Sequence, residues 1–378
     1  MTMQGITVPL YIEHNRPYID LDILGSEDSP HEARFLVDTG GGSFLLPEAV
    51  AHKVGMLLTG KDLIREYGSY LECISPPRVF VGRMPLDLAQ TDAFVVLEEG
   101  AVKREYGLIP GHILARYRVT FDYPHRQFML TSPGPFVPRG KALPTPIHPE
   151  SDFPRIEVEI DGQRYGMLLD TGASLTMISS TLLEQLATRH PDWPRASGGA
   201  IGTANMGERT VDEGVFMLRV SDLQLDLYTL KGNCAVSRPK ARFEQWLSQW
   251  TTEPVVGALA GNVLKLFRIE IDYASGITYF EQHAQPDQHD MDLVGLTLCP
   301  QRDGTYSIVA VSDRNDPHVL QSVRVGDILL QVDALKVTGL SLPQVVDALR
   351  GEPGHMHLLL LERDGALLAV NVPTARIL

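Results

Sequence analysis

The sequence contains the tripeptide Asp-Thr-Gly twice, and in both places it closes a run of apolar residues. The first copy occupies positions 38–40 after Phe-Leu-Val, and the second lies 132 residues later, at 170–172, after Met-Leu-Leu. An apolar run that ends in turn-forming residues is typical of a buried strand entering a loop. The pair therefore predicts two related strand-and-loop structures in one chain.

A second pair of matching segments supports an internal duplication. Gly107–Leu114 and Gly257–Leu264 share the order glycine, three residues, glycine, with an offset of 150 residues. Continued to Leu130 and Phe280, the two segments are identical at six of 24 positions, and most other positions exchange one apolar residue for another. Self-similarity of this kind indicates a repeated structural unit.

Proline content marks the boundary between the repeats. Residues 131–150 contain six prolines, which exclude a helix or a central strand and predict an extended connector. A polar stretch at 282–290 precedes a change of pattern. We expect a first unit at 1–132, a connector at 133–149, a second unit at 150–283 and a C-terminal unit at 291–378.

The first two units are expected to be mainly β. Residues 156–160 alternate apolar and charged side chains, Asp161-Gly162 predicts a tight hairpin turn, and 165–169 return as a second strand. The first unit shows a similar pair of strands at 18–24 and 33–37. Short helices are expected at 47–54, 180–187 and 242–250.

Asp38 and Asp170 are the candidate catalytic residues. Two carboxyl groups about 3 Å apart cannot both ionise, so one pKa rises and the pair shares a proton. The ionised member can then take a proton from a water that attacks a peptide carbonyl, while the protonated member donates to the carbonyl oxygen. The shared proton belongs to the pair rather than to either aspartate.

The residues that follow each aspartate suit this arrangement. Gly40 and Gly172 let backbone amides approach the carboxylates without an intervening side chain. Thr39 and Thr171 can hold the two loops together through hydroxyl bonds to the opposite backbone, which would fix the distance between the carboxyl groups.

An apolar run, Asp-Thr-Gly and a later glycine-centred motif together resemble the retropepsin and pepsin superfamily of aspartic proteases. The resemblance covers residues 10–280 and implies two fused β-barrel units in one chain, a dyad at their interface, catalysis by a monomer, and protein or peptide substrates. It also implies a flap hairpin midway in each unit, here 65–76 and 197–207. Gly198, Gly199 and Gly202 would form the second flap tip, whereas the first range departs from the pattern because it is not rich in glycine.

Two further departures concern the loops. Gly41 and Ala173 stand where pepsin-like enzymes often have a hydroxyl residue. Without that hydrogen bond the carboxylate pKa values are less depressed, which predicts optimal activity at about pH 5–7. The segment Asp-Thr-Gly-Gly-Gly at 38–42 also predicts a looser first loop than its counterpart at 170–174.

The C-terminal unit has its own pattern of short strands and one helix. Strands are expected at 294–298, 306–311, 325–332, 355–362 and 366–372, and Ser341 and Gln344 form a capping-box pair for a helix ending at Leu349. This order resembles the PDZ domains attached to bacterial proteases. Such domains bind C-terminal or extended peptides by strand addition. The resemblance implies capture by backbone amides near Val294, Gly295 and Leu296, and a pocket lined by Leu342 and Val346; a groove blocked by the protease is the alternative.

Composition restricts the partners. A net charge of −14 argues against nucleic acid and anionic membrane surfaces. No apolar run is long enough to span a membrane, and the common metal, nucleotide and serine-hydrolase signatures are missing, so no metal or organic cofactor is expected. Three widely spaced cysteines predict free thiols. The compartment is expected to be cytoplasmic as the chain stands, or the periplasm if a leader was removed.

The sequence thus predicts an aspartic endopeptidase that uses the pair Asp38 and Asp170 and docks substrates or regulators through a PDZ domain. The alternative from another class is a catalytically silent adaptor that keeps the fold and binds peptides without turnover.

Overall fold

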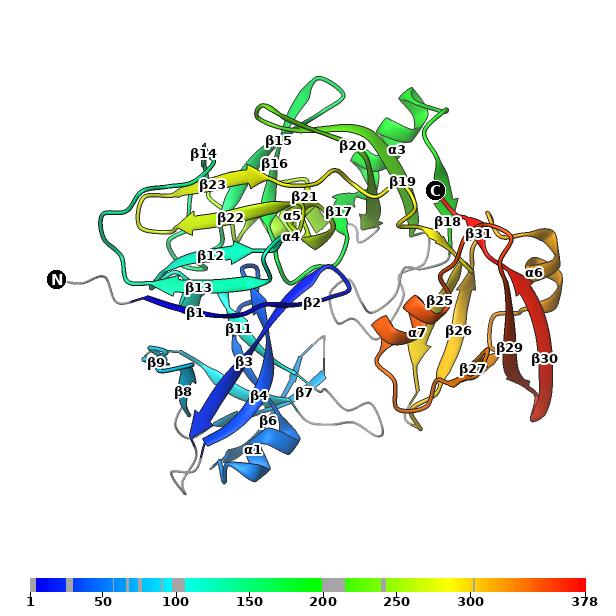
Figure 1. The fold of residues 1–378 in the computed structure, drawn as a ribbon, viewed down its shortest axis with the longest axis horizontal. Coiled ribbons are helices and arrows are strands. Elements are labelled where there is room, and N and C mark those ends of the chain that lie inside the picture. Colours follow the sequence, from blue (N-terminus) through cyan, green and yellow to red (C-terminus); the bar gives the residue numbers. More distant parts are fainter. Residues whose placement is uncertain are drawn as a thin grey trace.

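The structure is a computed structural model that describes residues 5–24, 30–56, 58–65, 68–73, 77–89, 91–96, 106–198, 215–238, 243–301 and 303–378. Within these residues the protein is mainly β, as expected (Figure 1). No helix in the described segments has the length and apolar character needed to cross a bilayer. The helices are short: α1 (Glu48–Lys53), α2 (Gly111–Leu114), α3 (Ser180–Arg189), α4 (Phe243–Ser248), α5 (Gly261–Leu264), α6 (Pro317–Ser322) and α7 (Leu342–Ala348).

The first unit contributes a ten-stranded sheet. In spatial order its strands are β6 (Leu58–Arg65), β7 (Gly68–Cys73), β10 (Ala93–Val96), β5 (Phe44–Pro47), β11 (Gly107–Pro110), β4 (Pro30–Asp38), β3 (Arg16–Leu24), β8 (Arg78–Val81) and β9 (Met84–Pro85), with β2 (Tyr11–Glu13) paired to β3.

The second unit contributes a seven-stranded sheet. Its order is β15 (Arg155–Ile160), β16 (Gln163–Leu169), β21 (Gly257–Leu259), β17 (Thr176–Ser179), β20 (Tyr228–Arg238), β19 (Phe216–Leu225) and β18 (Arg195–Ser197). β15 also pairs with β19, through Ile160 opposite Leu223, so six of these strands close into a barrel.

The first unit is a half-barrel, which corrects the expectation of two barrels. Among its described strands β3 pairs with β4, β2 and β8, and no pairing joins the two ends of the sheet. The short strands β8 and β9 occupy the edge of β3 that a closing strand would need. One closed barrel and one half-barrel still fit a retropepsin-like fold.

The two sheets use the same central pairings around the Asp-Thr-Gly segments. In the first unit β4 is parallel to β11, β11 antiparallel to β5, and β5 parallel to β10. In the second unit β16 is parallel to β21, β21 antiparallel to β17, and β17 parallel to β20. The strand that leads into each aspartate therefore has an equivalent partner in both units.

A third sheet joins the two units. Its order is β1 (Gly5–Pro9), β13 (Gln127–Thr131), β12 (Arg118–Asp122), β22 (Phe267–Asp272), β23 (Ile277–Gln282) and β14 (Lys141–Pro144). At the junction of β12 and β22, Arg118 lies opposite Asp272 and Asp122 opposite Arg268. The proline-rich connector supplies only the edge strand β14, as its prolines require.

The main apolar core runs through both units, from Leu10 to Phe280. Local sequence signals agree with the elements that surround it. Asp161 and Gly162 both have positive φ angles, 53° and 70°, and place Ile160 opposite Gln163 in the predicted hairpin. Side chains with short polar groups, and glycine, tolerate this left-handed backbone. The three predicted helices are α1, α3 and α4, and no end differs from the prediction by more than two residues.

The C-terminal unit has a separate core and a separate sheet, coloured orange to red in Figure 1. The sheet order is β25 (Leu296–Pro300), β26 (Tyr306–Val311), β27 (Ile328–Val332), β29 (Met356–Arg363) and β30 (Ala366–Pro373), with β28 (Leu335–Lys336) beside β27. Gln344 Oε1 accepts from the Ser341 amide, as the capping box predicts. Sequence analysis missed α6, although Asp316-Pro317 is a normal helix start and Asp316 accepts from the His318 amide.

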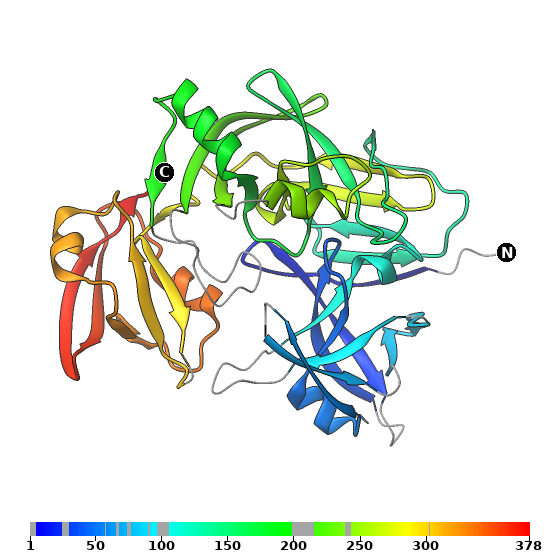
Figure 2. The same cartoon turned by 180° about the vertical axis from the view of Figure 1, so that it is seen from behind.

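The C-terminal unit is seated on the second unit, beside β18 in both views (Figures 1 and 2). Asp313 accepts from the Ser197 amide at 2.9 Å and donates its own amide to the Ser197 carbonyl at 3.0 Å. Apolar residues of both parts form one cluster: Ala196, Val215, Met217, Cys234 and Val236 with Met291, Leu293, Ile377 and Leu378.

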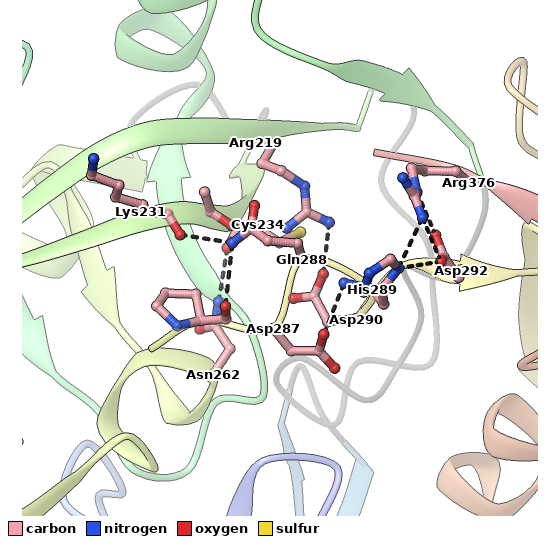
Figure 3. A network of polar contacts seen from close by, with 12 residues as sticks. Arg219, Lys231, Cys234, Asn262, Asp287, Gln288, His289, Asp290, Asp292 and Arg376 are labelled. Carbon is pink, nitrogen blue, oxygen red and sulfur yellow. Dashed lines mark hydrogen bonds and ion pairs between the residues drawn. The ribbon is translucent and has the colours of Figure 1, made fainter. Parts of the chain in front are cut away.

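Ion pairs hold the segment between the second unit and the C-terminal unit in place (Figure 3). The buried Arg219 of β19 donates to Asp290 at 2.7 Å, and Arg376 of β31 (Ala375–Arg376) donates to Asp292 of β24 (Asp292–Leu293) at 3.0 and 3.1 Å. Gln288 donates to the Lys231 carbonyl at 2.9 Å. The segment that leads into the C-terminal unit is thus bound to β19 and β20 rather than extended away from them.

Candidate active site

Each Asp-Thr-Gly loop begins where a central strand ends. β4 ends at Asp38, which pairs with Pro110 of β11. β16 ends one residue before Asp170, whose amide donates to the Leu259 carbonyl at 3.0 Å. The ends of both strands, residues 35–37 and 167–169, are buried and apolar, and the polar residues of each loop follow them directly.

The glycine-centred motifs cover the loops from behind. The Gly111 amide donates to the Gly41 carbonyl at 3.1 Å, and the Gly261 amide donates to the Ala173 carbonyl at 2.9 Å. A side chain at Gly111 would bring its Cβ to 2.8 Å from the Thr39 carbonyl oxygen. The close approach explains the need for glycine at this position of the repeat.

Thr39 and Thr171 connect the two loops through a reciprocal set of buried hydrogen bonds. The Thr39 hydroxyl donates to the Leu169 carbonyl at 2.6 Å, and the Thr171 hydroxyl donates to the Val37 carbonyl at 2.7 Å. Each hydroxyl oxygen also accepts the amide of the other threonine, at 3.0 and 3.1 Å. The carbonyls that accept precede the aspartates, so these bonds set the separation of Asp38 and Asp170.

The structure brings Asp38 and Asp170 together. Their side chains hydrogen-bond to each other. Gly172 lies so close to the opposite carboxyl group that a Cβ at this position would come within 2.2–2.4 Å of the Asp38 carboxyl atoms, and one at Gly40 would lie 3.0 Å from the Asp170 carboxyl carbon. Because Gly40 and Gly172 have no side chains, they leave room for the two carboxyl groups, which agrees with the supporting role predicted for them.

Backbone amides hold the two carboxyl groups unequally. Asp38 Oδ1 accepts the Gly40 amide at 2.9 Å, whereas Asp170 Oδ1 accepts the amides of Gly172 at 2.8 Å and Ala173 at 3.1 Å. Amide donors stabilise the ionised form of a carboxyl group. The extra amide therefore stabilises a negative charge on Asp170 more than on Asp38.

Both carboxyl groups are pushed toward protonation. Burial, and then the negative charge of Asp170, raise the pKa of Asp38, while burial raises the pKa of Asp170 against the opposing amides of Gly172 and Ala173. A pair with raised, mutually dependent pKa values can hold one proton and one negative charge at a higher pH than isolated carboxyl groups. This charge state is the one required for general acid and base catalysis on a bound water.

Sequence analysis missed a basic side chain beside this pair. Arg16, at the start of β3, is 4% exposed, and its positive charge lowers the pKa of both aspartates, although less than burial raises them. The only local signal was the turn-forming His14-Asn15 before it, which says nothing about proximity to a residue 22 positions further along the chain.

The predicted flap residues are only partly within the described chain. Gly199 and Gly202 lie outside it, as does most of 197–207. Gly198 follows β18, has φ of 67°, and lies against the Val311 carbonyl of the C-terminal unit. In the first unit, β6 and β7 form a hairpin that covers Arg65 and Gly68–Cys73 of the predicted range, while 74–76 are outside the described residues.

The structure does not leave the predicted peptide-binding amides free. The Val294 amide donates to the Leu349 carbonyl at 2.9 Å, and the Leu296 amide donates to the Val294 carbonyl at 2.9 Å. Asn315 hydrogen-bonds to both polar backbone groups of Gly295: its Oδ1 accepts from the glycine amide at 2.9 Å, and its Nδ2 donates to the glycine carbonyl at 2.8 Å.

The predicted pocket residues Leu342 and Val346 are 9% and 5% exposed and belong to the core of the C-terminal unit. In this conformation the three amides cannot donate to a carboxylate without first breaking internal hydrogen bonds.

No group of three or more histidine, cysteine, aspartate or glutamate side chains is arranged around a common point within the described residues. The three cysteines are free thiols, and Cys234 is fully buried, which raises the pKa of its thiol far above the ordinary value.

Comparison with known families supports one part of this site directly. Residues 156–232 match a family described as aspartyl protease. The match begins in β15, includes the second Asp-Thr-Gly and ends in β20, and it supports an aspartyl protease domain in this chain. No curated protein matches the sequence.

Proposed function

We propose that this protein is a single-chain aspartic endopeptidase in which Asp38 and Asp170 activate one water molecule for peptide hydrolysis. The observation that carries the proposal is the reciprocal bonding of Thr39 and Thr171, which keeps the two carboxyl groups in contact. If each Asp-Thr-Gly segment only formed a turn, hydrogen bonds between the two loops, which lie 132 positions apart, would not be needed. The family match to the second half, and its implied protein substrates, agree with this role.

The proposed reaction uses the pair with one proton. The ionised carboxylate removes a proton from the bridging water as the oxygen of that water attacks the scissile carbonyl carbon. The protonated partner donates its proton to the carbonyl oxygen, which gives a neutral tetrahedral diol. As the diol collapses, the protonated carboxyl group donates its proton to the amine nitrogen and the C–N bond breaks, while one diol hydroxyl returns its proton to the ionised carboxylate. The products are a carboxylic acid and an amine, and the dyad again holds one proton.

The domain organisation in this proposal consists of two fused retropepsin-like units, 1–132 and 150–283, the connector 133–149, and a PDZ domain at 291–378. The repeated strand pairings and the shared six-stranded sheet support the fusion and imply that one chain suffices for catalysis.

For the C-terminal unit, β25 is at the edge of its sheet within the described residues, which supports strand addition by an extended peptide. Val294, Gly295 and Leu296 would capture a peptide end, with Leu342 and Val346 lining the pocket, only after Asn315 releases Gly295.

The test is cleavage of denatured casein and a mixed peptide library between pH 3 and pH 8 by the full chain. Asp38→Asn and Asp170→Asn are each expected to lower kcat by at least about 100-fold, because either change removes the general acid and base pair. Asp192→Asn, an exposed carboxylate of the second unit, is the matched control and should cleave like the wild type. Peptide binding without cleavage at any pH would instead identify a silent adaptor.

A further inference from the structure

Arg16 is held beside the dyad by a hairpin turn that reaches the second unit. His14 and Asn15 form the turn between β2 and β3, with φ angles of 49° and 67°. Asn15 Nδ2 donates to the Ser174 carbonyl at 3.1 Å, and Lys265 Nζ donates to Asn15 Oδ1 at 2.7 Å. Ser174 closes the second Asp-Thr-Gly loop, so the turn fixes Arg16 next to the catalytic pair.

The guanidinium of Arg16 lacks the carboxylate partner that buried arginines normally have. It is 4% exposed, it forms no ion pair with any described residue, and its Nε is buried without a hydrogen-bond partner there. The guanidinium does have an uncharged partner, because it hydrogen-bonds to the side chain of Tyr106, and its central carbon lies 6.0 Å from the centroid of that ring. Among the ion pairs of the described residues, none joins Arg16 to Asp38 or to Asp170.

Most other buried arginines of the described residues do have a carboxylate partner. Four of them have a carboxylate oxygen within 4.0 Å: Arg118 with Asp272, Arg155 with Glu157, Arg219 with Asp290 and Arg268 with Glu270. Burial of a cation without a charged partner opposes folding, and a ligand carboxylate that paired with Arg16 would offset this cost.

The surroundings of Arg16 are positive as well. His14 has two buried ring nitrogens without hydrogen-bond partners in the described chain. Burial, followed by the positive charges of Arg16, Arg350 and Lys265, lowers the pKa of His14 to about 3. Lys265 and Arg350 have acceptors of their own, Asn15 for the first and Asp347 for the second. The unsatisfied polar atoms of this group therefore lie on His14 and Arg16.

We propose that Arg16 determines specificity by pairing with a carboxylate of the bound peptide next to the dyad. The inference rests on the endopeptidase function proposed above. A guanidinium offers two parallel N–H donors that match a carboxylate, which is why arginine is preferred for this recognition. The carboxylate is either a glutamate or aspartate side chain of the substrate or its C-terminal end, two sources with the same chemistry.

The experiment uses decapeptides of one sequence in which a single Glu, Gln or Lys is moved through every position, each made with a free and an amidated C-terminus. We expect the full-length wild type to cleave the peptide with Glu at one position with a kcat/KM at least about tenfold above that of the matching Gln peptide. A preference that depends on the free C-terminus instead would assign the carboxylate to the peptide end.

Variants then connect the preference to Arg16. Arg16→Gln should bring the Glu and Gln peptides to equal kcat/KM, Arg16→Glu should favour the Lys peptide, and Arg16→Lys should retain part of the original preference. Arg34→Gln is the control, because Arg34 lies on the neighbouring strand β4 and is already paired with Asp20. The proposal would be overturned if Arg16→Gln lowered kcat/KM equally for all peptides, left the ratio of kcat/KM between the Glu and Gln peptides unchanged and shifted the pH profile. Arg16 would then act only through its electrostatic effect on the dyad.

A binding measurement separates this inference from the proposed catalysis. The same peptides, fluorescently labelled, are titrated with the wild type and with Arg16→Lys, and thermal unfolding verifies that each variant is folded. If no peptide is cleaved but the Glu peptide still binds more tightly than the Gln peptide in an Arg16-dependent manner, the subsite stands and the endopeptidase function fails. If cleavage occurs without any preference for a carboxylate, the subsite fails and the function stands. Absence of both cleavage and binding overturns the subsite.

Discussion

Thr39 and Thr171 exchange hydrogen bonds with each other across the junction of the two units: each hydroxyl oxygen accepts the other residue's amide, at 3.0 and 3.1 Å. Because both hydroxyls also donate to the carbonyl before the opposite aspartate, no single loop can move without breaking bonds in the other. The contact between Asp38 and Asp170 is therefore a property of the pair of loops.

The threonine exchange can be tested by removing one hydroxyl. Thr39→Val keeps the side-chain shape but leaves the Thr171 amide and the Leu169 carbonyl without partners. Each unsatisfied buried group costs about 1–3 kcal/mol, so the free energy of unfolding should fall by at least that amount, together with kcat. Urea denaturation and peptide cleavage measure both effects. Thr39→Ser retains the hydroxyl and should stay close to the wild type; equal loss in both variants would contradict this account.

Space around the dyad gives a second prediction. In Gly172→Ala the new Cβ would lie 2.2 Å from the Asp38 carboxyl carbon, so the aspartate must move out of its position. We expect kcat/KM to fall by about 100-fold or more, since a displacement of about 1 Å can have that effect. Gly42→Ala is the control within the first loop, because nothing lies within 4 Å of its Cβ position. Activity retained in Gly172→Ala would argue against the pairing of the two carboxyl groups.

The raised pKa values of the dyad predict how stability changes with pH. The folded protein binds more protons than the unfolded chain above about pH 4, because burial raises the pKa values of Asp38 and Asp170 and the negative charge of Asp170 raises that of Asp38 further. Wild-type stability should therefore decrease as the pH rises from about 4 through the raised pKa values.

Asp38→Asn removes one charge of the pair, so its stability should decline less over the same interval and approach that of the wild type in acid. Urea midpoints recorded from pH 3 to pH 8 measure the difference. Curves that remain parallel over the whole range would show that the pair does not titrate together.

The attachment of the C-terminal unit gives a fourth prediction. Arg219→Met leaves Asp290, whose pKa is already raised by burial, without its 2.7 Å partner. Breaking a buried ion pair on one side should lower the free energy of unfolding by about 3–5 kcal/mol, and the double variant with Asp290→Leu should recover much of that loss.

The control for this pair is Arg139→Met, which breaks the exposed pair with Glu281 and should cost less than about 1 kcal/mol. Limited proteolysis between residues 283 and 291 reports on the same junction, and cleavage there should increase only in the single variant Arg219→Met. A double variant no more stable than Arg219→Met would show that the ion pair is not what fastens the segment.

Much of the local structure followed from the sequence. The alternation at 156–160 and the turn residues Asp161 and Gly162 specify their hairpin by themselves, because side-chain periodicity and positive φ are local properties. The same holds for the helix after Ser341, whose capping pair lies within four residues. Features that depend on strands far apart in the sequence could not be predicted in this way. One barrel is closed because β15 pairs with β19, and the other is not closed because β8 occupies the edge of β3.

The sequence by itself determined that two Asp-Thr-Gly loops exist, that each follows a buried strand, and which side chains flank each aspartate, since these are properties of neighbouring residues. Only the tertiary structure decided that Arg16 lies beside both carboxyl groups without an ion-pair partner among the described residues, and that Asn315 hydrogen-bonds to the amide and carbonyl of Gly295. Those relationships arise where separate segments are packed together. Burial and the charges of the packed neighbours fix them, and neither quantity can be read from residue type or spacing along the chain.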